Sequence, residues 1–377
     1  IGVDLKNEGG ALPLKKDLKK ILVTGPLADN AHGWMSRYGP QKLDFITPLA
    51  GLRAKLGPGV EVRYAAGCAV KDEHFPESDV LKEPPSDAVR AGIAAAVAAA
   101  ADVDEIVAVL GETDELCRES ASRISLNLPG YQEELLEALQ ATGKPLVLVL
   151  SNGRPLSVNW AVKHVPAIVE MWFPGEAGGA ALADILMGDY NPSGRLPVTF
   201  PRSVGQIPLN FPTHPGAQSR DPGQVTGPLF PFGFGLSYTA FQYADLKISP
   251  ERTGVGGTVD VACEVKNAGA VAGDEVVQLY LRDDYSSVTT WERELDGFAR
   301  VTLQPGEART DKFAVPPARL ALYDRDGHWT VEPGRFTAMI GASSEDIRLR
   351  GNFTLTRADG TAPEEVPLRD ERITDSR

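Results

Sequence analysis

The feature that most constrains the fold is a rhythm of short apolar segments and helical patterns between residues 21 and 200. Several apolar segments are continuous rather than alternating, which is typical of parallel strands that helices cover on both faces. Helical patterns lie between them, at 86–102 and 130–144. Strands that alternate with helices predict an α/β domain with a mostly parallel sheet. The strands are expected at KKILVTG (19–25), VEVRYAAG (60–67), EIVAVLG (105–111), PLVLVLSNG (145–153) and AIVEMWFPG (167–175).

The pattern of apolar residues along the chain changes near residue 200. Residues 205–240 carry many prolines and glycines with little periodicity, and are predicted to be a linker. From 241 to 355, apolar and polar residues alternate in short runs such as TVDVACEV and EVVQLYLRD. Such runs, separated by turn signals, are typical of a β-sandwich of the immunoglobulin or fibronectin type III kind. The charged segment 356–377 is expected to form a C-terminal tail.

The chain starts with IGVDLKNEGGALPL, without an initiator methionine or a signal-peptide pattern. This stretch has the pattern of the last turn of a helix followed by a loop, and no opening strand is expected in it. Residues 1–20 are therefore predicted to be an inter-domain linker, followed by the α/β domain at 21–204. The chain is expected to be a fragment, or one piece of a processed protein.

Charge and composition exclude several classes of partner. The net charge is −13 and no basic stripe is visible, so nucleic acid and anionic membrane surfaces are poor partners. No apolar run approaches the length of a membrane span. A neutral ligand is compatible with these numbers.

No metal site and no cofactor site are predicted. The three cysteines show no CxxC spacing and the five histidines show no ligand spacing. The segment GEAGGA lacks the spacing of a dinucleotide-binding loop, and no P-loop, GxSxG or HExxH motif occurs. Cys68 and Cys117 each follow a strand at the same expected edge of the sheet. A disulfide between them and two free thiols both stay open.

Polar and aromatic side chains are also expected at that edge. Ligands of open α/β sheets bind beyond the carboxyl ends of the strands, so these side chains are candidates for a binding site. Two interpretations stay open for Trp34 and Tyr38. They contact a sugar, whose C–H faces and hydroxyls suit aromatic rings beside carboxylates, or they pack against a neighbouring domain. Glu176 is expected to begin a helix and to stabilise its dipole. The other polar residues expected at this edge are Asp29, Asn30, Arg123, Asn152 and Arg154.

Six separated motifs carry a resemblance to a known family. They are LKNEGGALPL, ADN…GWMSRYG, GETDELCRESASRISLNLPGYQEELL, GKPLVLVLSNGRPL, MWFPGEAGGAALADILMGDYNPSGRLPVTFPRSVGQIP and PFGFGLSYT. Together, in this order, they resemble the later half of a glycoside hydrolase family 3 β-glucosidase of the bacterial periplasmic type. The family's architecture is a TIM barrel, then a six-stranded α/β sandwich domain, then a fibronectin type III-like domain. The resemblance implies the second and third parts, without the barrel.

The resemblance also implies a catalytic residue. The family is retaining, with an Asp nucleophile on the barrel and an acid/base Glu on the sandwich domain. The segment RESASR is similar to the family's H-E-A-S-S-R, which implies that Glu119 is the general acid/base. Glu112, which closes the preceding strand, is expected to be structural. Asp114 and Glu115 fall in the variable part and are expected to be solvated.

Three further residues are expected to bind substrate. In plant members of the family a loop with GGW and a second aromatic residue clamps the leaving sugar, and GWMSRY is similar to it. This resemblance implies contacts from Trp34 and Tyr38. Arg123, in the acid/base segment, is expected to bind a sugar hydroxyl or to face away from Glu119.

The nucleophile of the family is missing from this sequence. It lies in a Ser-Asp-aromatic motif, whereas here Ser78-Asp79 is followed by Val80 and Ser86-Asp87 by Ala88. The implied partner is therefore a TIM-barrel domain or chain that carries the nucleophile. The implied substrate is a β-glucoside or an oligosaccharide, and the implied location is periplasmic or secreted. A homodimer, a non-catalytic carbohydrate-binding or assembly module, and part of a family 3 β-xylosidase stay open as alternatives.

Overall fold

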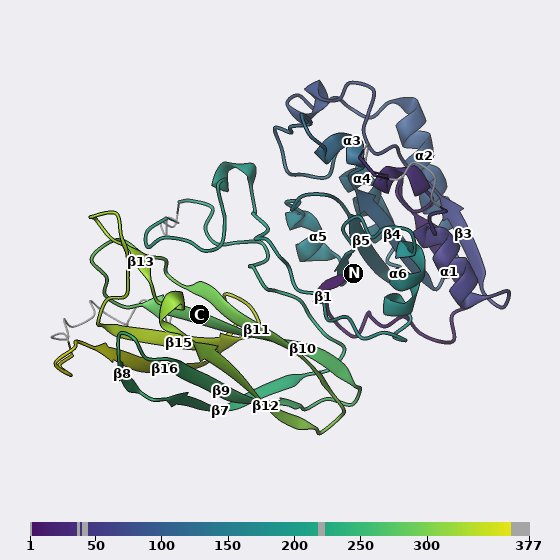
Figure 1. Cartoon of the computed structure of the whole chain (residues 1–377). Coiled ribbons are helices and arrows are strands. Elements are labelled where there is room, and N and C mark those ends of the chain that lie inside the picture. Colours follow the sequence, from purple (N-terminus) through teal and green to yellow (C-terminus); the bar gives the residue numbers. More distant parts are fainter. Residues whose placement is uncertain (1, 36–37, 40–43, 218–222, 363–377) are drawn as a thin grey trace.

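The computed structural model describes residues 2–35, 38–39, 44–217 and 223–362. Within these residues the chain forms an α/β domain and a β-sandwich domain, with an irregular segment between them (Figure 1). Most of the predicted C-terminal tail lies outside the described residues, which end at 362.

The first domain is built on a six-stranded sheet with the strand order β1-β6-β5-β4-β2-β3. The five strands β2 to β6 run parallel to one another, and β1 pairs antiparallel with β6. The predicted six-stranded, mostly parallel α/β architecture is confirmed. The strands are β1 (Val3–Asn7), β2 (Lys20–Thr24), β3 (Glu61–Ala65), β4 (Glu105–Gly111), β5 (Leu146–Ser151) and β6 (Ala167–Glu170).

Helices cover both faces of this sheet. Ile106 and Leu110 of β4 belong to the core under α2, α4 and α5, whereas Val107 and Val109 belong to the core under α1 and α6. Because both faces are buried, the central strands β4 and β5 are apolar except at one end, which is why they are continuous apolar runs in the sequence. The helices are α1 (Pro48–Leu56), α2 (Asp87–Ala99), α3 (Asp114–Cys117), α4 (Gln132–Gln140), α5 (Asn159–His164) and α6 (Gly178–Leu186), with 3₁₀ turns at Ala31–Trp34, Glu77–Asp79, Val204–Gln206 and Pro317–Arg319.

The expectation of a helix end and a loop at the start of the chain is wrong. Val3–Asn7 forms β1, which extends the sheet beside β6. The strand has only five residues, its pairing register shifts between Asp4 and Lys6, and Asp4 is buried although it is a charged residue type. A short, irregular strand with a buried carboxyl carries almost no periodic signal in the sequence.

The second domain is a β-sandwich whose strands pair antiparallel, except that β8 pairs parallel with β16, and the predicted fibronectin type III-like architecture is confirmed. A five-stranded sheet with the order β11-β10-β15-β16-β8 packs on a three-stranded sheet with the order β12-β9-β7. Inward-facing residues such as Val261, Cys263 and Leu279 form its core. The strands are β7 (Phe241–Ser249), β8 (Arg252–Gly254), β9 (Val259–Asn267), β10 (Gly273–Asp283), β11 (Glu294–Leu303), β12 (Ala308–Val315), β13 (Leu322–Tyr323), β14 (Trp329–Thr330), β15 (Arg335–Gly341) and β16 (Ile347–Thr356).

The segment between the domains packs on both of them (Figure 1). Phe230 pairs with Phe200 through the backbone and lies in the core of the α/β domain. On the other side, Gln278 of β10 donates a hydrogen bond of 3.1 Å to the carbonyl oxygen of Gly233. A buried ion pair between Arg195 and Glu275, at 3.1 Å, also joins the two domains. The proline-rich segment therefore holds the domains together rather than separating them.

Among the helices of the described ranges, none combines the length and the apolar character that crossing a bilayer requires.

Candidate active site

The loops that follow β2, β4, β5 and β6 meet at one edge of the sheet, as predicted. Trp34 from the loop after β2 donates a hydrogen bond of 2.8 Å from Nε1 to Oγ of Ser151, the last residue of β5. Ser151 Oγ donates in turn to the carbonyl oxygen of Trp172, which follows β6, at 3.0 Å. These bonds fix the loops relative to one another and to the strands.

The acid-rich loop leaves the sheet at a close backbone contact. Gly111 ends β4 with a φ of 138°, and a Cβ atom at this position would lie 2.0 Å from the carbonyl oxygen of Ser151. The next amide, of Glu112, donates to that same oxygen at 2.8 Å. A glycine is required here because β4 and β5 approach each other where the chain turns out of the sheet.

A tight turn presents Glu119 to the surface. The amide of Ala121 donates to the carbonyl oxygen of Arg118 at 3.0 Å, so that Glu119 and Ser120 are the two central residues of a β-turn. Ser120 has a φ of 64°, which is the conformation that a type II turn requires at its third position. Glu119 is exposed at the tip of this turn.

Tyr38 is the partner of Glu119. Its phenol donates a hydrogen bond to Oε2 of the Glu119 carboxylate, and its side chain is 68% exposed. This bond is the main cause that raises the pKa of the Tyr38 phenol, because a neighbouring carboxylate disfavours the phenolate. The structure thus places two of the predicted site residues in direct contact at the surface.

Trp34 has a different environment. Its side chain is 6% exposed and packs in the core of the α/β domain, with an edge-to-face contact to Phe45. Together with its hydrogen bond to Ser151, this packing favours a role in holding the loop after β2. The direct sugar contact that was expected for Trp34 stays a prediction.

Arg123 lies beneath the loop rather than at its surface. Its side chain is 1% exposed and is paired with Glu112 and Asp79, each at 3.0 Å. Burial raises the pKa of the Glu112 carboxyl, and the guanidiniums of Arg154 and Arg123 oppose that rise. The placement of Arg123 favours a structural role for both residues over the expected sugar contact of Arg123.

A second arginine, Arg154, approaches Glu112 from the loop after β5. Its Nε lies 3.3 Å from Glu112 Oε2, and its Nη2 donates to the carbonyl oxygens of Leu116 and, at 3.2 Å, Ala121. Asn152, expected at this edge of the sheet, is completely buried and donates from Nδ2 to the carbonyl oxygen of Arg154 at 2.8 Å.

Two acidic members of this network were not predicted from the sequence. Glu170, the last residue of β6, is completely buried and accepts hydrogen bonds from Asn152 at 3.0 Å and from the amide of Trp172 at 2.7 Å. Burial raises its pKa to about 8. Asp79, the partner of Arg123, ends the 3₁₀ turn Glu77–Asp79, in a segment with no strand pattern. Glu170 could have been found as a charged residue inside the apolar run AIVEMW. The residues around Asp79 contain no such indication of a buried ion pair.

Of the two acids that were expected to be solvated, Glu115 is exposed, whereas the Asp114 side chain is only 18% exposed. Glu115 is 63% exposed and pairs with Lys71 at 3.3 Å, and Asp114 lies 4.0 Å from Arg118. A hollow of about 550 Å³ lies next to them, between the loops after β2 and β4. It is lined by Asn30, His32, Gly33, Met35, Ala69, Val70, Lys71, Thr113, Asp114, Glu115 and Arg118.

Glu176 is exposed and lies two residues before α6 begins. Cys68 and Cys117 are both free thiols, so the structure has no disulfide between them. Burial raises the pKa of Cys117 to about 11, which keeps this thiol protonated at neutral pH. No group of three metal-ligating side chains occurs among the described residues.

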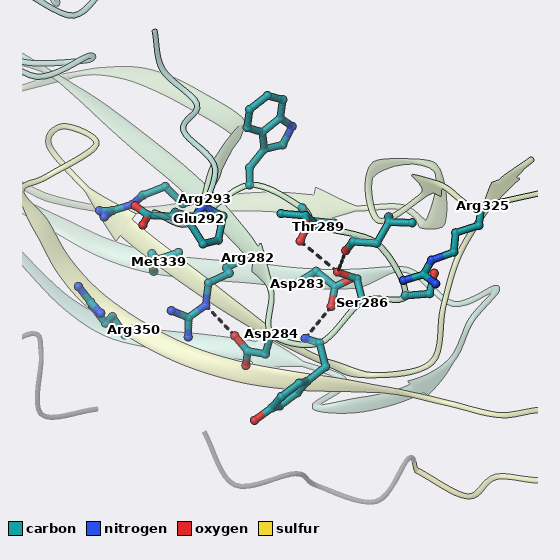
Figure 2. Close-up of a pocket in the computed structure, with 16 residues that line it drawn as sticks. Arg282, Asp283, Asp284, Ser286, Thr289, Glu292, Arg293, Arg325, Met339 and Arg350 are labelled. Carbon is teal, nitrogen blue, oxygen red and sulfur yellow. Dashed lines mark hydrogen bonds and ion pairs between the residues drawn. The ribbon is translucent and has the colours of Figure 1, made fainter. Parts of the chain in front are cut away.

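The sandwich domain has a hollow of its own, of about 610 Å³, which lies where β10 ends and β11 begins (Figure 2). Figure 2 shows Arg282 directed toward Asp284, and the two are joined at 2.8 Å. The side chain of Asp284 is completely buried and also accepts hydrogen bonds from Arg335 at 2.8 Å and Thr337 at 2.9 Å. This buried carboxylate is thus already bound by protein groups, which favours a structural role for it.

Comparison with known proteins supplies two family matches. Residues 3–238 match the glycosyl hydrolase family 3 C-terminal domain, and residues 275–344 match a fibronectin type III-like domain. The first match covers more than half of the chain, and the two segments correspond to the two domains described above.

Relatives that match most of this chain are named as β-xylosidases and β-glucosidases. A β-xylosidase of Formosa agariphila is 40% identical over 357 residues, which are 90% of this chain and 47% of the relative. A periplasmic β-glucosidase of Salmonella typhimurium is 39% identical over 371 residues, 93% of this chain and 48% of the relative. The solved structure of a β-glucosidase from Erythrobacter marinus superimposes with a TM-score of 0.87 at 39% identity, over 94% of this chain and 49% of that one. The chain thus spans about half the length of the relatives that it matches.

Proposed function

Because this chain belongs to glycoside hydrolase family 3, we propose that it supplies the general acid/base of a retaining β-glucosidase and that Glu119 is that residue. The observation that carries the assignment is the position of Glu119 at the exposed tip of a turn, in contact with Tyr38. Glu112 is buried between two arginines beneath the turn, and Glu115 pairs with Lys71. Glu119 is therefore the carboxylate of the segment that is best placed to meet a substrate.

The proposed reaction has two steps. In the first, a carboxylate of a barrel domain or chain attacks the anomeric carbon, while the Glu119 carboxyl donates its proton to the departing oxygen. In the second, the Glu119 carboxylate takes a proton from the water that releases the sugar. Retaining enzymes hold their two carboxyl groups about 5–5.5 Å apart, so the turn must extend over the mouth of the barrel.

Tyr38 is the substrate-binding residue that the geometry supports best. Its ring is largely exposed and its hydroxyl is held by Glu119, so that an aromatic face lies beside the acid/base group. A sugar packs on such a face through its C–H groups while its hydroxyls reach the neighbouring carboxylate. The buried side chains of Trp34 and Arg123 are proposed to support this site indirectly. Trp34 holds the loop after β2, and Arg123 holds the loop after β4.

The substrate is proposed to be a β-glucoside, such as a cello-oligosaccharide or an aryl β-glucoside. The β-glucosidase names of the Salmonella and Erythrobacter relatives support this choice. A β-xylosidase is the second candidate, since the relative from Formosa agariphila bears that name at 40% identity. Comparison of kcat/KM for 4-nitrophenyl β-glucoside and β-xyloside with the complete enzyme distinguishes the two.

The proposed partner and location follow from membership of glycoside hydrolase family 3. A TIM-barrel domain or chain is proposed to carry the nucleophile, because half of the length of the relatives lies outside the matched region. A periplasmic location is proposed by analogy with the relative named for it. Without the barrel, this chain is expected to bind sugars weakly and to hydrolyse none.

The decisive experiment is Glu119→Ala in the complete enzyme, with Glu115→Ala from the same loop as the control. Glu119→Ala should slow the hydrolysis of aryl glucosides with poor leaving groups by about 100-fold or more, since general acid catalysis contributes this much. Azide should partly restore turnover of activated aryl glucosides, because it replaces the water that Glu119 would have deprotonated. Unchanged kinetics for Glu119→Ala would exclude the assignment.

A further inference from the structure

Arg154 contacts both sides of the turn that carries Glu119. Its Nη2 donates to the carbonyl oxygen of Leu116, which precedes the turn, and to that of Ala121, which closes it, at 3.2 Å. One guanidinium from the loop after β5 therefore joins two points of the loop after β4, on either side of the proposed acid/base residue.

The guanidinium is itself held in place from two directions. Nε lies 3.3 Å from Glu112 Oε2, and the Glu112 side chain is completely buried. The backbone of Arg154 is held by Asn152, which donates to its carbonyl oxygen at 2.8 Å and to Glu170 at 3.0 Å. The ends of β4, β5 and β6 thus determine where the Arg154 side chain lies, and through it where the turn lies.

The Tyr38 phenol also contacts this turn, through its hydrogen bond to Glu119, but both of those side chains are exposed. The tip of the turn is exposed, and Ser120 adopts a φ of 64°, a conformation that non-glycine residues disfavour. An exposed loop with a disfavoured backbone angle samples several conformations unless tertiary contacts select one. Rigid placement matters here, because proton transfer needs the carboxyl within hydrogen-bond reach of the glycosidic oxygen.

We propose that Arg154 is a positioning residue for the acid/base catalyst: by bridging the carbonyl oxygens of Leu116 and Ala121, it fixes the distance between Glu119 and the glycosidic oxygen. This inference rests on the proposed role of Glu119. Arg154 does not touch the reacting atoms, so it acts only through the turn. Its removal should therefore weaken proton donation while the attack by the barrel nucleophile proceeds.

The sandwich domain offers a matched control. Figure 2 shows Arg282 beside Asp284, a carboxylate whose side chain is completely buried. Arg335 pairs with the same carboxylate, much as Arg154 and Arg123 both pair with Glu112. Arg282→Met removes a partly exposed arginine from such a pair and leaves the second arginine in place. It reproduces the electrostatic change of Arg154→Met at a site far along the chain from the turn.

The test measures kcat/KM in the complete enzyme for a series of aryl β-glucosides with good and poor leaving groups. Arg154→Met should lower the values for poor leaving groups by about 100-fold, the cost of a misplacement of about 1 Å, and those for good leaving groups much less. Arg154→Lys should fall between Met and wild type, since an ammonium cannot reproduce the fixed fork of a guanidinium. Arg282→Met should leave the dependence on the leaving group as in the wild type.

A second measurement uses this chain alone and does not depend on activity. Hydrogen exchange of peptides that span Leu116–Ala121 should be faster in Arg154→Met and in Arg154→Lys than in the wild type, and unchanged in Arg282→Met. This readout keeps the proposal testable if Arg154→Met destabilises the complete enzyme.

The outcomes separate the two proposals. If Glu119→Ala lowers the rate for poor leaving groups and the Arg154 variants do not, or lower both classes equally, the positioning role is wrong and the role of Glu119 stands. If exchange at Leu116–Ala121 is the same in all variants, the positioning role is also wrong. If Glu119→Ala has no effect, both proposals fail together.

Discussion

The phenol of Tyr38 donates a hydrogen bond to the carboxylate of Glu119, across 81 positions of the sequence. The two residues come from the loops that follow β2 and β4, which are neighbouring strands of the sheet. The contact can be tested in this chain by itself, because a tyrosine reports the charge beside it.

Glu119→Gln is expected to lower the pKa of Tyr38. The carboxylate raises that pKa through its hydrogen bond, so a neutral amide should let the phenol ionise at a lower pH. The measurement is an ultraviolet titration of phenolate formation, with Tyr38→Phe to identify the signal. Glu115→Gln, which removes a neighbouring exposed carboxylate, should leave the Tyr38 signal where it is; an equal shift in that variant would contradict a specific contact.

Ser120 is expected to tolerate glycine but not valine. Its φ of 64° lies in the left-handed region, where glycine has no steric penalty and a β-branched residue is strongly disfavoured. Ser120→Val should lower the free energy of unfolding by about 1–3 kcal/mol. For Ser120→Gly, the relieved strain and the more flexible unfolded chain should nearly cancel. Urea unfolding of the two variants checks this, and equal stabilities would rule out the turn geometry.

Asp4 is expected to make the α/β domain less stable as the pH rises. Burial raises its pKa to about 7, from 3.8 for an unperturbed aspartate. The folded state therefore binds a proton that the unfolded state releases, so stability is highest below pH 3.8 as far as this group is concerned. It falls as the pH rises toward 7, by as much as about 4 kcal/mol if the full shift applies.

Asp4→Asn should remove this contribution, because an amide does not ionise. The slope of unfolding free energy against pH between about 4 and 7 should then be smaller than in the wild type. Asp17→Asn, at an exposed position nearby in the sequence, is the control. A wild-type slope in Asp4→Asn would show that Asp4 is not the group responsible.

The ion pair of Arg195 and Glu275 is expected to couple the two domains. Both side chains are nearly buried, at 8% and 4% exposure, so removal of one partner leaves a charge without its counterion. Arg195→Met should destabilise the chain by about 3–5 kcal/mol, and the double variant with Glu275→Met should recover much of that loss. Calorimetry should show whether the two domains then unfold separately. If the losses of unfolding free energy in the two single variants add up in the double variant, the two residues are not directly coupled.

The candidate site could be predicted only in part. Glu119 and Tyr38 were both expected at the edge of the sheet, and they meet there, although the sequence did not indicate their hydrogen bond. Trp34 was expected beside a ligand or a neighbouring domain, but it packs within the core of its own domain. Its local pattern is that of an aromatic residue in a polar loop, which does not reveal which way the ring points.

The sequence by itself determined the succession of an α/β domain and a β-sandwich, because strand and helix periodicities are local. It also determined that an acid-rich segment follows a buried strand, since the apolar run EIVAVLG directly precedes it. Only the tertiary structure decided that β1 joins the sheet, that Arg123 is buried against Asp79, and that Arg154 donates to the carbonyl oxygens of Leu116 and Ala121. These contacts join residues far apart in the chain, and a buried charge is recognisable only when its partner is known.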